Sequence, residues 1–127
     1  MILKMYQITD FPTFFEKIKS LKLPLKTAYK LSLLVKVIDD KIQFYQEKLQ
    51  EILMDCAQLD ENNHPIPTKN GNGVKIKPGF ETECMNRVNE LQSLEIELPD
   101  TKFNIDDFGN IEISVEMFSV ILPFIEE

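Results

Sequence analysis

The sequence predicts an α+β fold that is mainly α, and three observations lead to this prediction. Residues 25–59 contain neither glycine nor proline, and their apolar residues recur in alternating steps of three and four. Residues 60–79 gather turn-forming residues. Residues 95–127 alternate apolar and polar positions before a capped helical stretch. A chain of 127 residues fits a single domain, 1–127.

The N-terminal part, 1–59, predicts a short strand, a short helix and a long helix. Residues 2–8 alternate loosely, as in a strand. Thr9 and Asp10 are good caps, Pro12 suits a first helical turn, and the apolar spacing that follows predicts a helix over 11–22. Pro24 ends this helix, because the residue before a proline disfavours helical geometry.

The long helix is expected to begin near Pro24 and to end near Leu59, a length on the order of 50 Å. One apolar seam follows it: Ala28, Leu31, Val35, Ile38, Ile42, Tyr45, Leu49, Ile52 and Cys56. A small globule cannot bury such a seam completely, so the N-terminal half (Ala28, Leu31, Val35 and Ile38) is a candidate protein-binding surface. Either the helix 11–22 covers that half and the protein is a monomer, or the seam mediates self-association, which the length of the helix favours.

Residues 60–79 are expected to form a small exposed β-hairpin or an ordered loop at the tip of a helical hairpin, and residues 80–94 are expected to form the second arm of that helical hairpin. Asn70-Gly71 or Asn72-Gly73 suits a β-hairpin turn, and the prolines at 65 and 67 restrict one arm to an edge strand. Residues 80–94 predict a helix that packs antiparallel on about 42–58. Cys56 and Cys84 both lie on apolar helix positions, which predicts buried, unlinked thiols.

Residues 95–127 are expected to form a small acidic β/α cap. The segments 94–98, 103–105 and 111–113 alternate like short strands, with a turn at 106–109. Ser114 is a good N-cap for a closing helix, and Pro123 weakens its last turn.

Charge is distributed unevenly along the chain. Residues 1–48 carry nine lysines and five acids, whereas residues 90–127 carry ten acids and one lysine, in a chain of net charge −7. The acidic third disfavours nucleic acid and suits a basic protein, so Asp106 and Asp107 are candidate protein-binding residues; a simply solvated face is the alternative. The lysine-rich half contains no arginine and no interleaved exposed aromatic residues, so phosphate contact there is the weaker hypothesis.

The residue types that carry catalysis or hold metals are sparse. The one histidine, His64, lies in a turn, neither cysteine belongs to a CxxC pair, and the four glycines form no nucleotide-binding fingerprint. We therefore expect no catalytic residues, no metal site and no cofactor, and the chain is not expected to be an enzyme.

Three segments, taken together, carry a resemblance to known proteins: LPLKTAYKL at 23–31 running into the long helix, DENNHPIP at 60–67, and EIELP at 95–99 with the end PFIEE at 123–127. The chain thereby resembles small uncharacterised accessory proteins of tailed bacteriophages and prophages of Gram-positive bacteria. The resemblance implies a phage or prophage origin and assigns no site residues.

The expected function is that of a non-catalytic phage-encoded protein-binding module, such as an inhibitor of a host or defence factor. The alternatives are a virion or assembly accessory protein that self-associates through the long helix, and a nucleic-acid-associated accessory that uses the lysine-rich half. We expect a protein partner, of host or phage, or a homo-oligomer. The absence of an apolar membrane-length run or a visible signal peptide predicts a cytoplasmic location without a membrane partner. The resemblance implies that the cell is a bacterial host.

Overall fold

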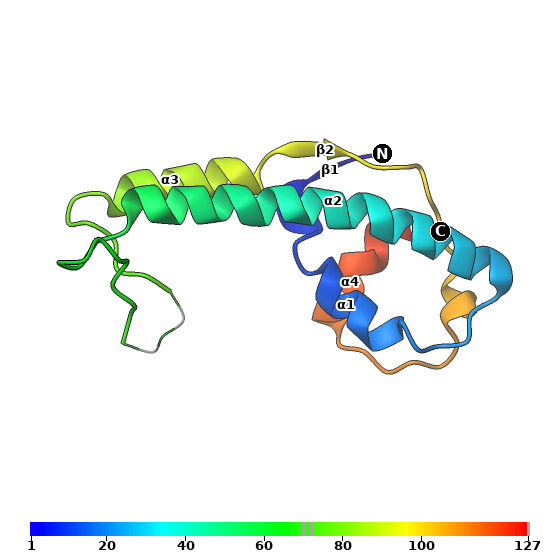
Figure 1. Cartoon of the computed structure of the whole chain (residues 1–127). Helices are drawn as coiled ribbons and strands as arrows, with labels where there is room; N and C mark the ends of the chain where they lie inside the picture. Colours follow the sequence, from blue (N-terminus) through cyan, green and yellow to red (C-terminus); the bar gives the residue numbers. More distant parts are fainter. Residues whose placement is uncertain (70, 72, 127) are drawn as a thin grey trace. The chain divides into compact units, whose positions relative to one another are not determined.

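The computed structural model of the chain describes residues 1–69, 71 and 73–126, and its fold is α+β and mainly α, as the sequence predicts. The chain forms two compact units. The larger unit comprises Met1–Ile42 and Glu95–Glu127, and the smaller unit comprises Gln43–Leu94. Helix α2 (Leu25–Cys56) supplies residues to both units (Figure 1).

Helix α2 is continuous over 32 residues because nothing in its sequence interrupts backbone hydrogen bonding. It starts directly after Pro24, whose carbonyl accepts a bond from the Ala28 amide at 2.9 Å. It ends at Cys56, earlier than the predicted Leu59, because a later segment of the chain donates a hydrogen bond to the carbonyl at the end of the helix. The Lys77 amide donates to the Cys56 carbonyl at 2.8 Å, which supplies a partner that a helix end otherwise lacks.

The larger unit contains a two-stranded antiparallel sheet of β1 (Ile2–Lys4) and β2 (Glu95–Glu97), with Leu3 opposite Ile96. The sequence predicts both strands from their alternation but does not predict that they pair. Ile96 is buried and its neighbours Glu95 and Glu97 are exposed, so β2 places one face on the core and one in solvent.

The core of the larger unit is rich in phenylalanine. Helix α1 (Phe11–Ile18) contacts helix α4 (Val115–Ile121), and the ring of Phe11 lies 6.3 Å from that of Phe124, edge to face. Helix α1 ends before the predicted residue 22, because the Leu21 amide already turns back to the Ile18 carbonyl. Helix α4 begins as predicted: the Ser114 hydroxyl accepts a hydrogen bond from the Met117 amide at 3.0 Å.

The strands predicted at 103–105 and 111–113 are wrong. Phe103 makes only a single parallel bridge with Ile125, Ile105–Phe108 is a 3₁₀ turn, and residues 111–113 have no regular structure. Their apolar positions alternate for another reason: Ile105, Ile111 and Ile113 line an apolar cavity instead of one face of a sheet.

The smaller unit is the predicted antiparallel helical hairpin. Helix α3 (Glu81–Gln92) packs on the second half of α2, and their shared core is formed by Ile52, Cys56, Cys84 and Leu91, with Tyr45, Leu49, Leu53, Ile76 and Val88 against it. Gln92 reaches Tyr45 at 3.4 Å, whereas Arg87 reaches Asp55 at 3.1 Å, so the two helices run in opposite directions.

The connection between these helices is an irregular hairpin held by single antiparallel bridges, among them Ala57 with Ile76 and Pro67 with Val74. Prolines lack the amide hydrogen that a continuous ladder needs, which explains why the described residues of this connection form no regular strand. Of the two predicted turn dipeptides, Gly71 has the expected positive φ of 72°. Asn70 and Asn72 lie outside the described residues.

Candidate functional site

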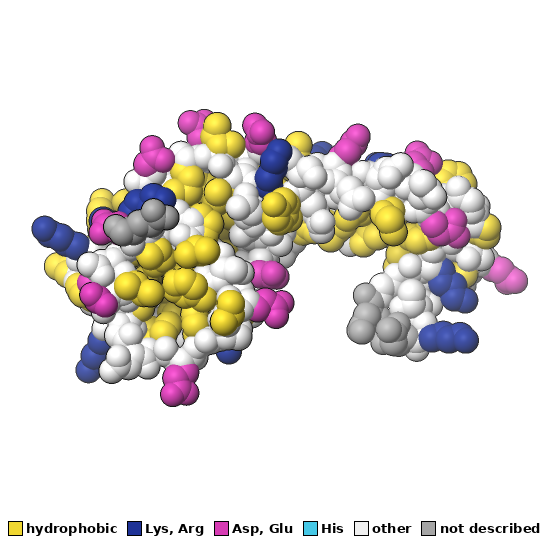
Figure 2. Space-filling model, turned by 180° about the vertical axis from the view of Figure 1, so that it is seen from behind, with side chains coloured by type: hydrophobic (Ala, Val, Ile, Leu, Met, Phe, Trp, Pro, Cys, Tyr) yellow, Lys and Arg dark blue, Asp and Glu magenta, His cyan; other side chains and the backbone are white. Residues whose placement is uncertain are grey.

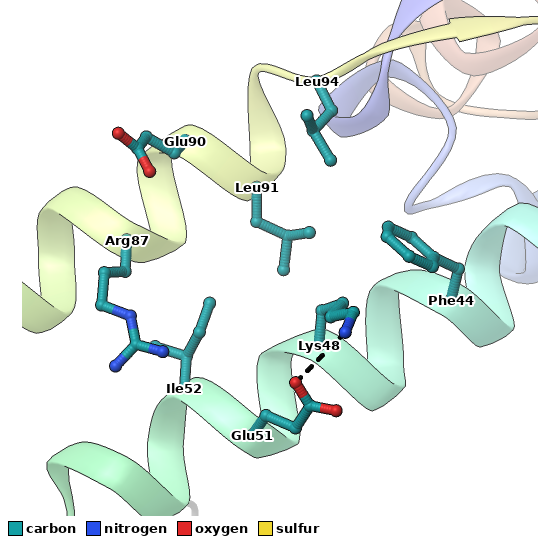
Figure 3. A pocket seen from close by; sticks show the side chains of 8 residues that line it. All are labelled: Phe44, Lys48, Glu51, Ile52, Arg87, Glu90, Leu91 and Leu94. Carbon is teal, nitrogen blue, oxygen red and sulfur yellow. Dashed lines mark hydrogen bonds and ion pairs between the residues drawn. The ribbon is translucent and has the colours of Figure 1, made fainter.

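The smaller unit carries an open groove of about 280 Å³ between α2 and α3. Its floor is formed by Ile52 and Leu91, which are buried, and Phe44 and Leu94 stand at one end with their side chains 43% and 42% exposed. Figure 3 shows these four apolar side chains converging from the two helices. A water-exposed apolar hollow of this kind is typical of a surface that binds another molecule.

Helical periodicity builds this groove from two short stretches of sequence. On α2 its lining residues are Phe44, Lys48, Glu51 and Ile52, and on the other side they are Arg87, Glu90, Leu91 and Leu94. Spacings of three, four and seven residues place side chains on one face of a helix, so each stretch presents a single edge to the groove. Leu94 lies just beyond the end of α3, where its amide turns back to the Leu91 carbonyl.

The rim of the groove is charged, with both signs present. Lys48 forms an ion pair with Glu51 at 3.3 Å, and its ammonium also lies 5.8 Å from the centre of the Phe44 ring. Arg87 pairs with Asp55 at 3.1 Å, a hydrogen bond that raises the pKa of the guanidinium. Exposed pairs of this kind add little stability, but they can orient a bound partner.

The two cysteines lie in the hairpin core and not in the groove. Both are buried and free, as predicted from their helix positions. Burial, together with a hydrogen bond to the Cys56 thiol, raises the pKa of the Cys84 thiol, which keeps it protonated and slow to react. The pair contributes to the packing of the hairpin core.

The N-terminal half of the long seam is not the open surface that the sequence suggested. Leu31 and Ile38 are 4% and 0% exposed, and Leu34, which lies between them, is also fully buried. Ala28 and Val35 are half-buried. Leu31 and Ile38 are therefore not available as protein-binding residues, and of the two alternatives that the sequence left open, a seam half covered within the chain holds for them.

The acidic pair predicted to bind protein is divided between two roles. Asp107 is half-buried and accepts a hydrogen bond from the Thr27 hydroxyl at 2.6 Å, so it ties the C-terminal segment to the first turn of α2. Of the two acids, only Asp106 is exposed.

The apolar periodicity of the sequence does not identify the exposed apolar residues of either unit. Phe44 and Leu94 lie off the seam, as do Leu25, Tyr29 and Leu33 on α2, and no helical repeat in the sequence distinguishes a covered apolar position from an exposed one. The signal that the sequence offered for these surfaces was the presence of large apolar residues at helix positions outside the seam.

Among residues 1–69, 71 and 73–126, no three metal-binding side chains come close enough to hold an ion, and no helix has the length and apolarity to cross a bilayer. Comparison of the chain with protein-family models, with curated proteins and with solved structures returned no match.

Proposed function

We propose that this chain is a non-catalytic protein-binding module whose groove between α2 and α3 receives an amphipathic helix of a partner protein. The observation that supports this proposal is the layout of the groove: a buried apolar floor, two half-exposed apolar side chains at one end, and a charged rim. An apolar centre within a polar rim is the usual anatomy of a protein interface.

The hairpin favours a helix as the occupant. Two antiparallel helices leave an open furrow along their contact, and a third helix in that furrow completes a small bundle. From Phe44 to Ile52 the groove follows α2 for eight residues, or about 12 Å, which corresponds to roughly two turns of a partner helix. Such a helix would insert apolar side chains at spacings of three, four and seven residues.

The mixed charge of the rim favours a protein over a nucleic acid as the partner. Lys48 and Arg87 are each close to a carboxylate, so neither offers an uncompensated cation to a phosphate backbone. A partner helix with charges of both signs would match this rim.

The resemblance to phage and prophage accessory proteins supports a phage-encoded module that acts in a bacterial host, as an inhibitor of a host or defence factor. A virion or assembly accessory protein is the alternative. Both roles require the same binding event and differ in the identity of the protein that is bound.

The test uses a photo-reactive phenylalanine analogue in place of Phe44, expressed in cells of the host, with the same analogue at Met85 as control. Met85 is 65% exposed on α3 and does not line the groove. We expect a defined cross-linked protein from position 44 that is absent from position 85.

A second variant ties the cross-link to the groove. Leu94→Glu places a charge at its apolar end and is expected to abolish the product from position 44, whereas Met85→Glu is expected to leave it unchanged. Equal products from both positions, or a product that survives Leu94→Glu, would count against the groove as the binding site.

A further inference from the structure

The larger unit exposes an apolar stripe on the solvent side of α2. Leu25, Tyr29 and Leu33 are 86%, 65% and 46% exposed, and their spacing of four residues aligns them along one face, away from the buried Leu31, Leu34 and Ile38. We call these three residues the outer stripe. Large apolar side chains in line on a helix mark a surface that another molecule covers.

The surroundings of the outer stripe are basic. Residues 17–38 contain six lysines and no acid, and Lys26 and Lys30 directly follow Leu25 and Tyr29. The Lys30 ammonium donates to the Lys102 carbonyl at 3.1 Å, a bond that leaves its charge in place. What covers the stripe must therefore combine apolar surface with negative charge.

The same unit contains a cavity with complementary properties. It measures about 170 Å³ and is lined by apolar side chains and one glycine; Phe14 and Phe108 are buried in it, while Ile105, Ile111, Ile113 and Phe118 reach the surface. A cavity of about 150 Å³ lined by such residues accepts a benzene ring, so this one has room for a single leucine-sized side chain. Figure 2 shows hydrophobic side chains gathered on one face of this unit.

Acids flank the cavity. A neighbouring hollow shares Phe108, Gly109 and Ile111 with it and carries Asp106 and Asp107, with Lys22 as its one cation. Glu112 is exposed between the lining residues Ile111 and Ile113. Residues 103–116 contain four acids and no lysine or arginine. The cavity therefore suits an apolar side chain that arrives on a basic segment.

We propose that the occupant is a second copy of this chain, whose Leu25 enters the cavity while its Lys26 and Lys30 face Asp106 and Glu112. Leu25 is the best match, because the side chains that line the cavity are all apolar and Leu25 is the most exposed residue of the stripe. The contact involves no residue of the groove in the smaller unit and is independent of the partner proposed for it.

The two surfaces adjoin one another within one protomer, so the contact can be reciprocal. Pro24, which lines the acidic hollow, immediately precedes Leu25, and Thr27 in the same turn donates to Asp107. A twofold axis close to this point lets each copy donate its outer stripe and accept that of the other. The result is a closed dimer and not an open chain.

The experiment is a charge exchange followed by sedimentation of the full chain. One variant combines Lys26→Glu with Lys30→Glu, the other combines Asp106→Lys with Glu112→Lys, and the control combines Lys69→Glu with Lys75→Glu in the smaller unit. We expect the wild type and the control to dimerise as concentration rises, and each exchanged variant alone to remain monomeric, because both reciprocal contacts then oppose like charges.

Mixing the two exchanged variants is the decisive measurement. In the mixed dimer one contact has the original charges and the other has both signs reversed, so we expect dimers to reappear at the wild-type affinity. Because Leu25 is exposed, Leu25→Ser is expected to leave folding unaffected. It is expected to lower the affinity of the dimer at least tenfold. A wild type that stays monomeric at near-millimolar concentration, or a mixture that stays monomeric, would overturn the proposal, as would dimers that persist in either variant alone.

Discussion

Replacing Ile38 by alanine distinguishes a buried seam from a binding seam. Ile38 is fully buried in the larger unit, whereas Leu25, on the same helix, is 86% exposed. If the N-terminal half of the seam belongs to the core, Ile38→Ala must destabilise the monomer and Leu25→Ala must not.

The expected magnitude follows from burial. Three carbons are removed at about 0.8 kcal/mol each, which gives about 2.4 kcal/mol for transfer alone. The cavity left in a packed core adds to this loss, and measured costs of such truncations lie at about 2–5 kcal/mol. We therefore expect Ile38→Ala to lower the free energy of unfolding by about 3 kcal/mol, a large part of the roughly 5–15 kcal/mol that holds a domain together. Leu25→Ala should stay within about 0.5 kcal/mol of the wild type.

The assay is urea unfolding followed by circular dichroism, at a concentration where the wild type sediments as a monomer, so that association does not contribute. The dependence of the free energy on urea should be unchanged for both variants. If Ile38→Ala leaves stability within about 0.5 kcal/mol while dissociating an oligomer, the seam is an interface and the reasoning from burial is wrong.

Four further outcomes are expected. Cys56 and Cys84 should react slowly with a thiol reagent until denaturant is added. The folded pKa of Cys84 is raised from 9.0, so the stability that its protonated thiol contributes should be complete below pH 9.0 and should be lost as the pH rises through the folded pKa. Unfolding midpoints at alkaline pH measure this loss. Ser114→Ala should cost about 1 kcal/mol in urea unfolding and Ser114→Asp much less, since aspartate also caps a helix. Thr27→Val should cost about 1–3 kcal/mol, since it leaves half-buried Asp107 without this donor; a variant as stable as the wild type would show that the bond does not matter. EDTA should leave the thermal midpoint unchanged, and a fall of several degrees would reveal a metal ligand set.

Local sequence determined the elements whose signals are local. An uninterrupted run without glycine or proline forms α2, the serine at 114 caps α4, and the apolar stripe of 80–94 pairs with the second half of the seam, the part that precedes it along the chain across the connection 57–80. The burial of both cysteines follows from the same periodicity. In each case the interacting groups lie within one helix or in two helices adjacent along the chain, where the cost of closing the intervening loop is small.

Only the tertiary structure decided which apolar surfaces are covered. Leu31 and Leu33 are equally apolar and two residues apart, yet the first is 4% and the second 46% exposed. The pairing of β1 with β2 and the apolar cavity at Ile111 and Ile113 also join segments far apart in sequence. Periodicity shows that a face is apolar, but the burial of that face depends on distant segments folding over it. The residues of the face do not indicate which segments these are.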